Sequence, residues 1–196
     1  MRHRVRRAIQ LVGSVPEEGT DFVTANSHAP RPVGPTQFRR AMGRFATGVS
    51  IVTTTAPDGP LLAMTASAVS SVSLTPPLVL VCIGKQAHLA DAIREAEGFA
   101  FSFLHESQAA LSNYFAGFWP EDMPDPSYEF VSWAGQVRIA AAIAAMACRR
   151  TSVHEEGDHW IVVGEVTDTY VEDGAPAPLL YVGGGYGRYQ PFEEPR

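Results

Sequence analysis

Short runs of apolar and β-branched residues, separated by glycine and proline, recur along this chain and predict a protein built mainly of β-strands. The predicted strands cover residues 49–55, 64–74, 78–83, 99–104, 160–171 and 179–189. Thr75-Pro76-Pro77 separates two of these runs because proline cannot donate to a strand ladder, and Gly183-Gly184-Gly185 divides the last run. Pro57-Asp58-Gly59 is a turn that joins the first strand to the second. The pattern favours a β-dominated α+β or barrel architecture.

Three short segments have helical spacing instead. Apolar side chains recur at i, i+3, i+4 and i+7 over residues 38–45, so we expect a helix there that buries an aromatic face. Thr36 is its expected N-cap and Gly48 its stop. Two further helices are expected over residues 87–96 and from the N-cap Ser107 to residue 116.

An alanine-rich stretch over residues 139–148 poses a conflict. Its composition has strong intrinsic helix propensity, although its neighbours in sequence have the pattern of strands. Propensity by itself predicts a helix.

Composition bounds the class of protein. With 196 residues and 45% hydrophobic content, the chain can bury one core, which we expect over residues 36–190. Residues 1–35 lack hydrophobic period and are expected to be a disordered or loosely attached extension, and residues 191–196 a tail. The net charge of −6 argues against nucleic acid or an anionic membrane as the main partner. The two separated cysteines and the lack of a signal-peptide pattern or a membrane-length apolar run predict a soluble cytoplasmic protein.

Residues 64–82 combine strand-forming residues with an unusual density of Ser, Thr and Ala. Small residues let a ligand approach the backbone, so that amide N–H groups and hydroxyls can meet its heteroatoms. This segment is either the wall of a ligand site or a Ser/Thr-rich edge strand.

Two other segments carry candidate chemistry. Lys85-Gln86-Ala87-His88 opens a predicted helix and is either a phosphate-binding turn or a solvated one. Residues 154–159 crowd potential metal ligands, but they lack the helical histidine pair of a zinc protease and fit an acidic turn centred on Gly157. In such a turn Asp158 can fix the tautomer of His159.

The sequence disfavours two kinds of site and leaves the role of one loop undecided. Gly183 to Gly187 is not followed by a helix, which argues against a phosphate loop, and no Gly-x-Ser-x-Gly motif supports a nucleophilic serine. Residues 117–128, with Trp119 and three prolines, form either a covering element or an ordinary surface loop.

Taken in order, three motifs resemble the flavin reductase family, the small reductase components of two-component flavin monooxygenases, which have the FMN-binding split-barrel fold. The motifs are residues 38–49, residues 64–67 followed by 71–79, and Gly157-Asp158-His159 with residues 163–166. The resemblance covers about residues 38–189 and implies a mainly β, Greek-key split barrel with short helices. It also assigns a strand to the alanine-rich stretch.

The resemblance implies an NAD(P)H-dependent flavin reductase, in which NADH or NADPH delivers a hydride to FMN or FAD and the reduced flavin serves a partner monooxygenase. Such a reaction needs stacked rings more than an acid or base, so no catalytic acid/base residue and no metal is expected. A homodimer is also implied. The expected flavin-binding residues are Met64, Thr65, Ala66, Ser67, Ala68, Ile83, Gly84, Lys85, Gln86, His88 and Tyr181, and the expected nicotinamide-positioning residues are Asp158, His159 and Tyr186.

The sequence also departs from the family pattern. Ala87 and Leu89 stand where the family usually has Ser and Thr, so phosphate contacts are expected from the backbone, Lys85, Gln86 or His88. Val182 and Gly183 replace residues that are often polar. Two alternatives therefore stay open: a non-catalytic flavin carrier or sensor on the same fold, and a metal-dependent enzyme that uses His154, Asp158 and His159.

Overall fold

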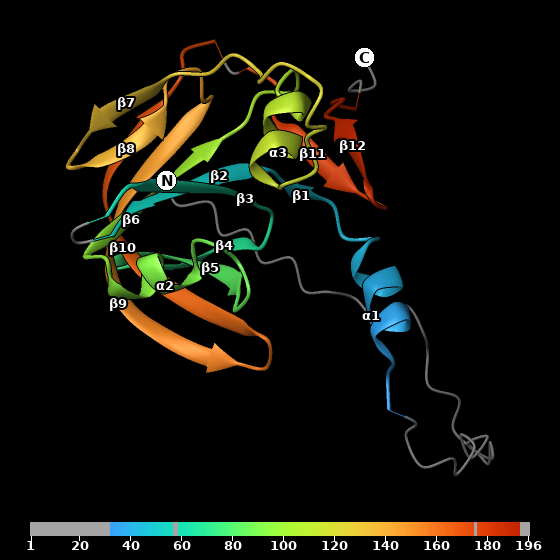
Figure 1. Ribbon diagram of the computed structural model, residues 1–196, viewed down its shortest axis with the longest axis horizontal. Coiled ribbons are helices and arrows are strands. Elements are labelled where there is room, and N and C mark those ends of the chain that lie inside the picture. The colour runs from blue at the N-terminus through green and yellow to red at the C-terminus, as the bar shows by residue number, and fades with distance from the viewer. Residues whose placement is uncertain (1–31, 57–58, 175, 193–196) are drawn as a thin grey trace, which may run out of the picture. The chain divides into compact units, whose positions relative to one another are not determined.

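The structure is a computed structural model that describes residues 32–56, 59–174 and 176–192. Strands predominate, and the helices are short (Figure 1). The helices are α1 (Pro35–Met42), α2 (Ala90–Glu95) and α3 (Ala109–Phe115). The strands are β1 (Thr47–Gly48), β2 (Ser50–Thr55), β3 (Leu61–Ala66), β4 (Val69–Leu74), β5 (Pro77–Gly84), β6 (Gly98–Phe103), β7 (Phe130–Trp133), β8 (Gln136–Ile139), β9 (Ala144–Glu156), β10 (His159–Val171), β11 (Leu179–Val182) and β12 (Gly185–Arg188).

Seven of the described strands form one antiparallel sheet in the order β3-β2-β6-β9-β10-β5-β4. Strands β3 and β4 are its two edges, yet only Ser67 and Ala68 separate them in the chain. A link of this length spans about 10 Å at most, so the sheet must curl until its two edges meet. No ladder joins β3 to β4 among the described residues, and we call Ser67 and Ala68 the β3–β4 seam.

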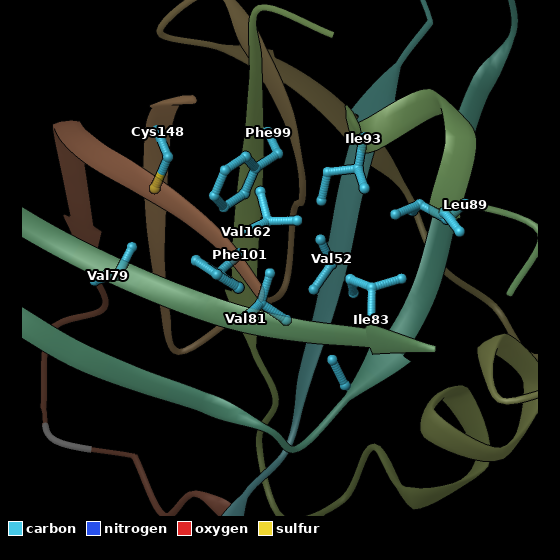
Figure 2. Close-up of a cluster of buried hydrophobic side chains, with 12 residues drawn as sticks. Val52, Val79, Val81, Ile83, Leu89, Ile93, Phe99, Phe101, Cys148 and Val162 are labelled. Atoms are coloured by element: carbon cyan, nitrogen blue, oxygen red, sulfur yellow. The ribbon is translucent and has the colours of Figure 1, made fainter. Parts of the chain in front are cut away.

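The main core lies inside the curl of this sheet. Side chains from β2, β3, β5, β6, β9 and β10 form this cluster, and Leu89 and Ile93 close one end of it (Figure 2). Val52, Val81, Ile83, Phe99, Phe101 and Val162 are each fully buried in it. Burying a side chain of this size contributes about 1.5–3 kcal/mol, so this cluster is the main source of folding free energy.

A second core packs on the opposite face of β2 and β6. Ile51 and Val52 are neighbours on β2, so their side chains point to opposite faces, and both are fully buried. Ile51 packs with a cluster that contains Leu104, Leu111 and Leu179, which brings α3 and β11 onto this face. Side chains on the two faces of β2 thus contribute to both cores.

Gly164 is required by close packing inside the main core. A Cβ atom at this position would lie 2.7 Å from Phe99 Cζ and 2.9 Å from Cys148 Cβ, distances that real Cβ atoms do not tolerate. The register between β9 and β10 also shifts beside Gly164. The glycine in the motif over residues 163–166 therefore makes room for the Phe99 ring.

Most of the predicted strands are confirmed, but the run predicted over residues 64–74 is two strands, because the chain passes from β3 to β4 at Ser67 and Ala68. The alanine-rich stretch is mostly strand, as the family resemblance implied. Residues 144–148 belong to β9, which pairs with β6 on one side and β10 on the other. Small alanine side chains suit a strand that lies between two others, and the ladder hydrogen bonds on both sides outweigh the helix propensity.

Several details of the predicted helices are wrong. Thr36 lies inside α1, which begins at Pro35 and ends at Met42, so Thr36 is not its N-cap, and Gly48 belongs to β1 and does not end the helix. The apolar side of α1 is not buried, since Phe38 is 59% and Met42 51% exposed. Ser107 does not cap α3, which starts at Ala109; its hydroxyl lies 2.8 Å from His105 Nδ1 instead.

A hairpin formed by β7 and β8 was not predicted. Its turn, Ala134-Gly135, has positive φ at both residues, which is the conformation of a two-residue hairpin turn. Two of the sequence predictions, the turn over residues 57–59 and the extension over residues 1–35, lie wholly or largely outside the described residues. Within the described part of the chain, no helix is long and apolar enough to cross a bilayer.

Candidate functional site

The β3–β4 seam is where the hydroxyl-rich segment leaves one strand partner for another. Up to Ala66 the chain pairs with β2, and from Val69 it pairs with β5. Ser50 Oγ donates a buried 2.8 Å hydrogen bond to the Ala66 carbonyl, and the Cys82 amide donates to the Ala68 carbonyl at 3.0 Å. The seam is thus fixed on both sides while the small side chains of Ser67 and Ala68 leave space in front of it.

One pocket of about 450 Å³ opens on the α3 side of the seam. We call it the tyrosine pocket; Thr65, Ser67, Asn113, Phe118, Tyr181 and Tyr186 are among the residues that line it. Tyr186 Oη lies 2.8 Å from Asn113 Oδ1 and 3.0 Å from Ser112 Oγ. Because a phenol has one proton and the amide oxygen only accepts, Tyr186 donates to Asn113, and the Ser112 hydroxyl can donate to Tyr186.

A second hollow, of about 650 Å³, opens on the α1 side of the seam. We call it the α1 hollow; Phe38, Met42, Ser67, Leu80, Cys82 and Tyr181 are among the residues that line it. Ser67 and Tyr181 line both spaces, so a flat group lying along the seam would contact both. Side chains larger than those of Ser67 and Ala68 would fill this space.

The turn that follows β5 comes at the end of the strand that pairs with β4, the strand that begins after the seam. Lys85 Nζ contacts Glu155 Oε1 at 2.5 Å and the Gly157 carbonyl at 2.6 Å. His88 Nε2 lies 3.0 Å from the Ala63 carbonyl, at the edge of β3. Among the described residues, none accepts a hydrogen bond from the backbone amides of Gln86 and His88.

The hairpin that joins β9 to β10 carries Asp158 and His159 beside this turn. His159 pairs with Gly84 across the ladder, and a Cβ on Gly84 would lie 3.8 Å from His159 Nε2. Asp158 Oδ1 lies 2.7 Å from His159 Nδ1, so the carboxylate orients the ring as expected. This hydrogen bond and the charge of a protonated His159 hold the pKa of Asp158 below its ordinary value.

The predicted site residues are only partly brought together. Thr65, Ser67, Tyr181 and Tyr186 line the tyrosine pocket, and Ala68 lines the α1 hollow. Ile83 is fully buried in the main core and Met64 packs against it, so these two side chains face away from the seam. His159 lies on the β9–β10 hairpin, whereas Tyr186 hydrogen-bonds to α3.

Sequence reasoning missed several residues of the tyrosine pocket, among them Ser112, Asn113 and Phe118. Ser112 and Asn113 lie on α3, where the pattern showed only an apolar face, and Phe118 lies near the start of the long loop over residues 117–128. Ser112 is a fully buried polar residue that also accepts from Thr65 Oγ1 through its carbonyl at 2.6 Å. No local pattern distinguishes it from a surface serine.

The metal alternative has no support in the arrangement of side chains. The described part of the chain contains no cluster of three His, Cys, Asp or Glu residues able to hold an ion. His154 Nε2 instead lies 3.0 Å from Ser152 Oγ on the same strand.

Comparison with known proteins identifies the family of this chain. The family model described as "Flavin reductase like domain" matches residues 42–190. This chain belongs to the flavin reductase family.

Relatives of this chain include an NADH-dependent FMN reductase and the reductase component of a monooxygenase. "FMN reductase (NADH) SmoA" of Agrobacterium fabrum is 38% identical over 156 residues, which are 78% of this chain and 84% of that protein. The reductase component of 4-nitrophenol 4-monooxygenase/4-nitrocatechol 2-monooxygenase from Rhodococcus opacus is 36% identical over 162 residues, or 83% of this chain and 85% of that protein. The family assignment therefore rests on matches along most of both chains.

A solved flavin reductase shares the fold. The NADH:FAD oxidoreductase from Streptomyces globisporus, solved in complex with NAD and FAD fragments, superposes with a TM-score of 0.72 at 33% sequence identity. The match covers 84% of this chain and all of that one. The predicted mainly β fold of the flavin reductase family is confirmed.

Proposed function

We propose that this protein is an NADH-dependent flavin reductase that transfers a hydride to FMN or FAD and supplies the reduced flavin to a partner monooxygenase. The observation that carries the proposal is the β3–β4 seam, where small residues leave space on both sides between two fixed strand edges. The space runs beside the seam and has the hydroxyls of Thr65 and Ser67 and the amide of Asn113 at its border. A planar ring system with polar edges fits such a site.

In this proposal the residues of the chain hold the flavin and the nicotinamide in position, and none of them acts as a general acid or base. When bound, flavin accepts the hydride that the nicotinamide gives up. Thr65, Ser67 and the seam backbone would hold the ring edge, and Tyr181 would cover it. His159, oriented by Asp158, would hold the polar group of the nicotinamide. Holding two rings in contact supplies most of the acceleration that such a reaction needs.

The turn after β5 would receive the phosphates. Its backbone amides at Gln86 and His88 are donors without a partner among the described residues, and such groups bind anions. Ala87 and Leu89 add no hydroxyl there. Few phosphate contacts fit a flavin that leaves after reduction, which makes flavin a substrate as much as a cofactor.

A homodimer is part of the proposal. Phe38, Met42 and Phe45 are exposed apolar side chains that border the α1 hollow, and a second copy of this chain would cover them. Large exposed apolar groups that lie together mark interaction surfaces. A cytoplasmic location, expected from the two cysteines, which are free in the structure, stays a prediction.

The decisive experiment is a steady-state assay of nicotinamide oxidation with FMN, FAD or riboflavin, run with NADH and with NADPH. We expect flavin-dependent oxidation of NADH; its absence with every flavin would reject the proposal. Flavin binding, seen as quenched flavin fluorescence, without any nicotinamide oxidation would favour the carrier or sensor alternative. The NADPH arm decides whether the protein also accepts the phosphorylated donor.

A further inference from the structure

Lys85 has more contacts with the β9–β10 hairpin than with the turn that carries it. Its ammonium group reaches Glu155 Oε1 and the Gly157 carbonyl, and it lies 5.2 Å from the centre of the Trp160 ring. Its backbone amide donates to the Asp158 carbonyl at 3.0 Å. Lys85 therefore contacts the strand before His159, the turn itself and the residue after His159.

The ammonium group of Lys85 also forms an ion pair with a carboxylate in this position. Lys85 is 28% exposed in its side chain, and its hydrogen bond to Glu155 holds the pKa of that carboxyl below its ordinary value. An ammonium has three donors, and Glu155 and Gly157 take two of them. A phosphate that bound Lys85 in this position would meet only its one remaining donor.

Trp160 adds a second restraint on the same hairpin. The Arg94 guanidinium of α2 lies 4.1 Å from the centre of its ring, while Arg94 also pairs with Asp91 at 3.0 Å. Cations over an indole face are attracted by its quadrupole. The residue that follows His159 is thus in contact with two cationic side chains, Lys85 and Arg94, from one segment of the chain.

From these contacts we propose that Lys85 is a positioning residue: it fixes the tip of the β9–β10 hairpin and thereby places His159 for the nicotinamide, instead of binding the flavin phosphate. This inference rests on the proposed function and deepens it. Loss of the ammonium group should therefore raise the Michaelis constant for NADH. It should leave the constants for FMN, which carries a phosphate, and for riboflavin, which carries none, equally unaffected.

The test compares Lys85→Met, Lys85→Arg and Glu155→Gln with wild-type protein. Lys85→Met should raise the Michaelis constant for NADH about 3-fold to 10-fold, the range for a lost charge-assisted hydrogen bond at a partly exposed site, with kcat nearly unchanged. The constants for FMN and riboflavin should not change. Lys85→Arg should recover most of the loss, and Glu155→Gln should reproduce part of it.

Arg149→Met is the matched control. Arg149 forms an ion pair with Glu165 across the same two strands, at a ladder position away from the hairpin tip. We expect Arg149→Met to leave the constant for NADH at the wild-type value. An equal rise in both variants would mean general loosening of the hairpin and would overturn the inference.

Two further readouts separate this inference from its rivals. A rise in the constant for FMN but not for riboflavin in Lys85→Met would make Lys85 a phosphate ligand and overturn the proposal. Amide hydrogen exchange needs no turnover: residues 155–160 should exchange faster in Lys85→Met but not in Arg149→Met. If wild-type protein oxidises no NADH, the proposed function fails, and unchanged exchange would separately reject the positioning role.

Discussion

Thr65 Oγ1 donates a 2.6 Å hydrogen bond to the backbone carbonyl of Ser112, which joins the hydroxyl-rich strand β3 to helix α3. The same Ser112 meets Tyr186 through its own hydroxyl. One buried residue thus connects two walls of the tyrosine pocket. The position of Thr65 beside the seam depends on α3 as well as on the sheet.

Thr65→Val keeps the shape of the side chain but removes this donor. We expect the free energy of unfolding to fall by about 0.5–1.5 kcal/mol, the contribution of a hydrogen bond of this kind. The Michaelis constant for flavin should also rise, because Thr65 is no longer held against α3 in the wall of the tyrosine pocket. Thr167→Val is the control, since Thr167 Oγ1 makes a similar 3.1 Å bond to the Ala147 carbonyl away from both pockets. Equal flavin constants in Thr65→Val and wild type would argue against a flavin along β3.

His159→Ala should raise the Michaelis constant for the nicotinamide by about one to two orders of magnitude, and that for flavin much less, if a charge-assisted hydrogen bond is lost. Steady-state kinetics with each substrate varied in turn would measure the split. His154→Ala provides a control, because His154 lies on the neighbouring strand and contacts Ser152. Equal effects of His159→Ala on both substrates would contradict the nicotinamide assignment.

Gly164→Ala should destabilise the protein by about 1–3 kcal/mol, because the added methyl group would overlap the Phe99 ring and Cys148. The measurement is urea unfolding, compared with Gly48→Ala, where an added Cβ would meet nothing within 4 Å. A fully stable Gly164→Ala protein would mean that Phe99 can move aside at no cost.

The α1 surface makes a prediction about assembly. We expect a dimer for wild-type protein in light scattering after size exclusion, and a monomer for the double variant Phe38→Glu, Met42→Glu, because charges there oppose burial. Val171→Glu should stay dimeric, since Val171 is an exposed apolar residue at the end of β10, outside the residues that line the α1 hollow. A monomeric wild-type protein would reject the dimer.

The Cys148 thiol makes stability sensitive to alkaline pH. Burial raises its pKa from about 9 to about 12. Between these values the unfolded chain has lost the thiol proton and the folded chain has kept it, so stability falls as pH rises, by up to about 1.4 kcal/mol per pH unit. The stability advantage of wild type over Cys148→Ala should therefore shrink above pH 9. Parallel urea-unfolding curves for the two proteins from pH 7 to 10 would contradict this.

Local chemistry was enough to predict most strands. The run over residues 78–83 is apolar because Val79, Val81 and Ile83 enter the main core, while Leu80 and Cys82 line the α1 hollow. The alanine-rich stretch shows the limit, because its helix propensity is reversed by pairing with β6 and β10, strands that lie elsewhere in the sequence. Helix propensity is a local property, so it does not show which distant strands a segment will pair with.

The site was harder to predict than the fold for the same reason. Thr65 and His159 belong to recognisable motifs, but the contact of Lys85 with Glu155 joins residues that are 70 positions apart. A basic residue at the start of a helix suggests phosphate in sequence, whereas its actual partner becomes visible only in three dimensions. The exposed side of α1 is a similar case, since its periodicity predicts burial but does not say against what.

The β3–β4 seam separates what the fold requires from what a ligand would recognise. Strand β3 is held by β2 and β4 by β5, and within the described residues no ladder pair includes Ser67. A change at Ser67 therefore costs little folding free energy, while it alters the wall shared by both pockets. Substituting Ser67 would thus reshape the space offered to a bound ring without breaking a ladder pair of the barrel.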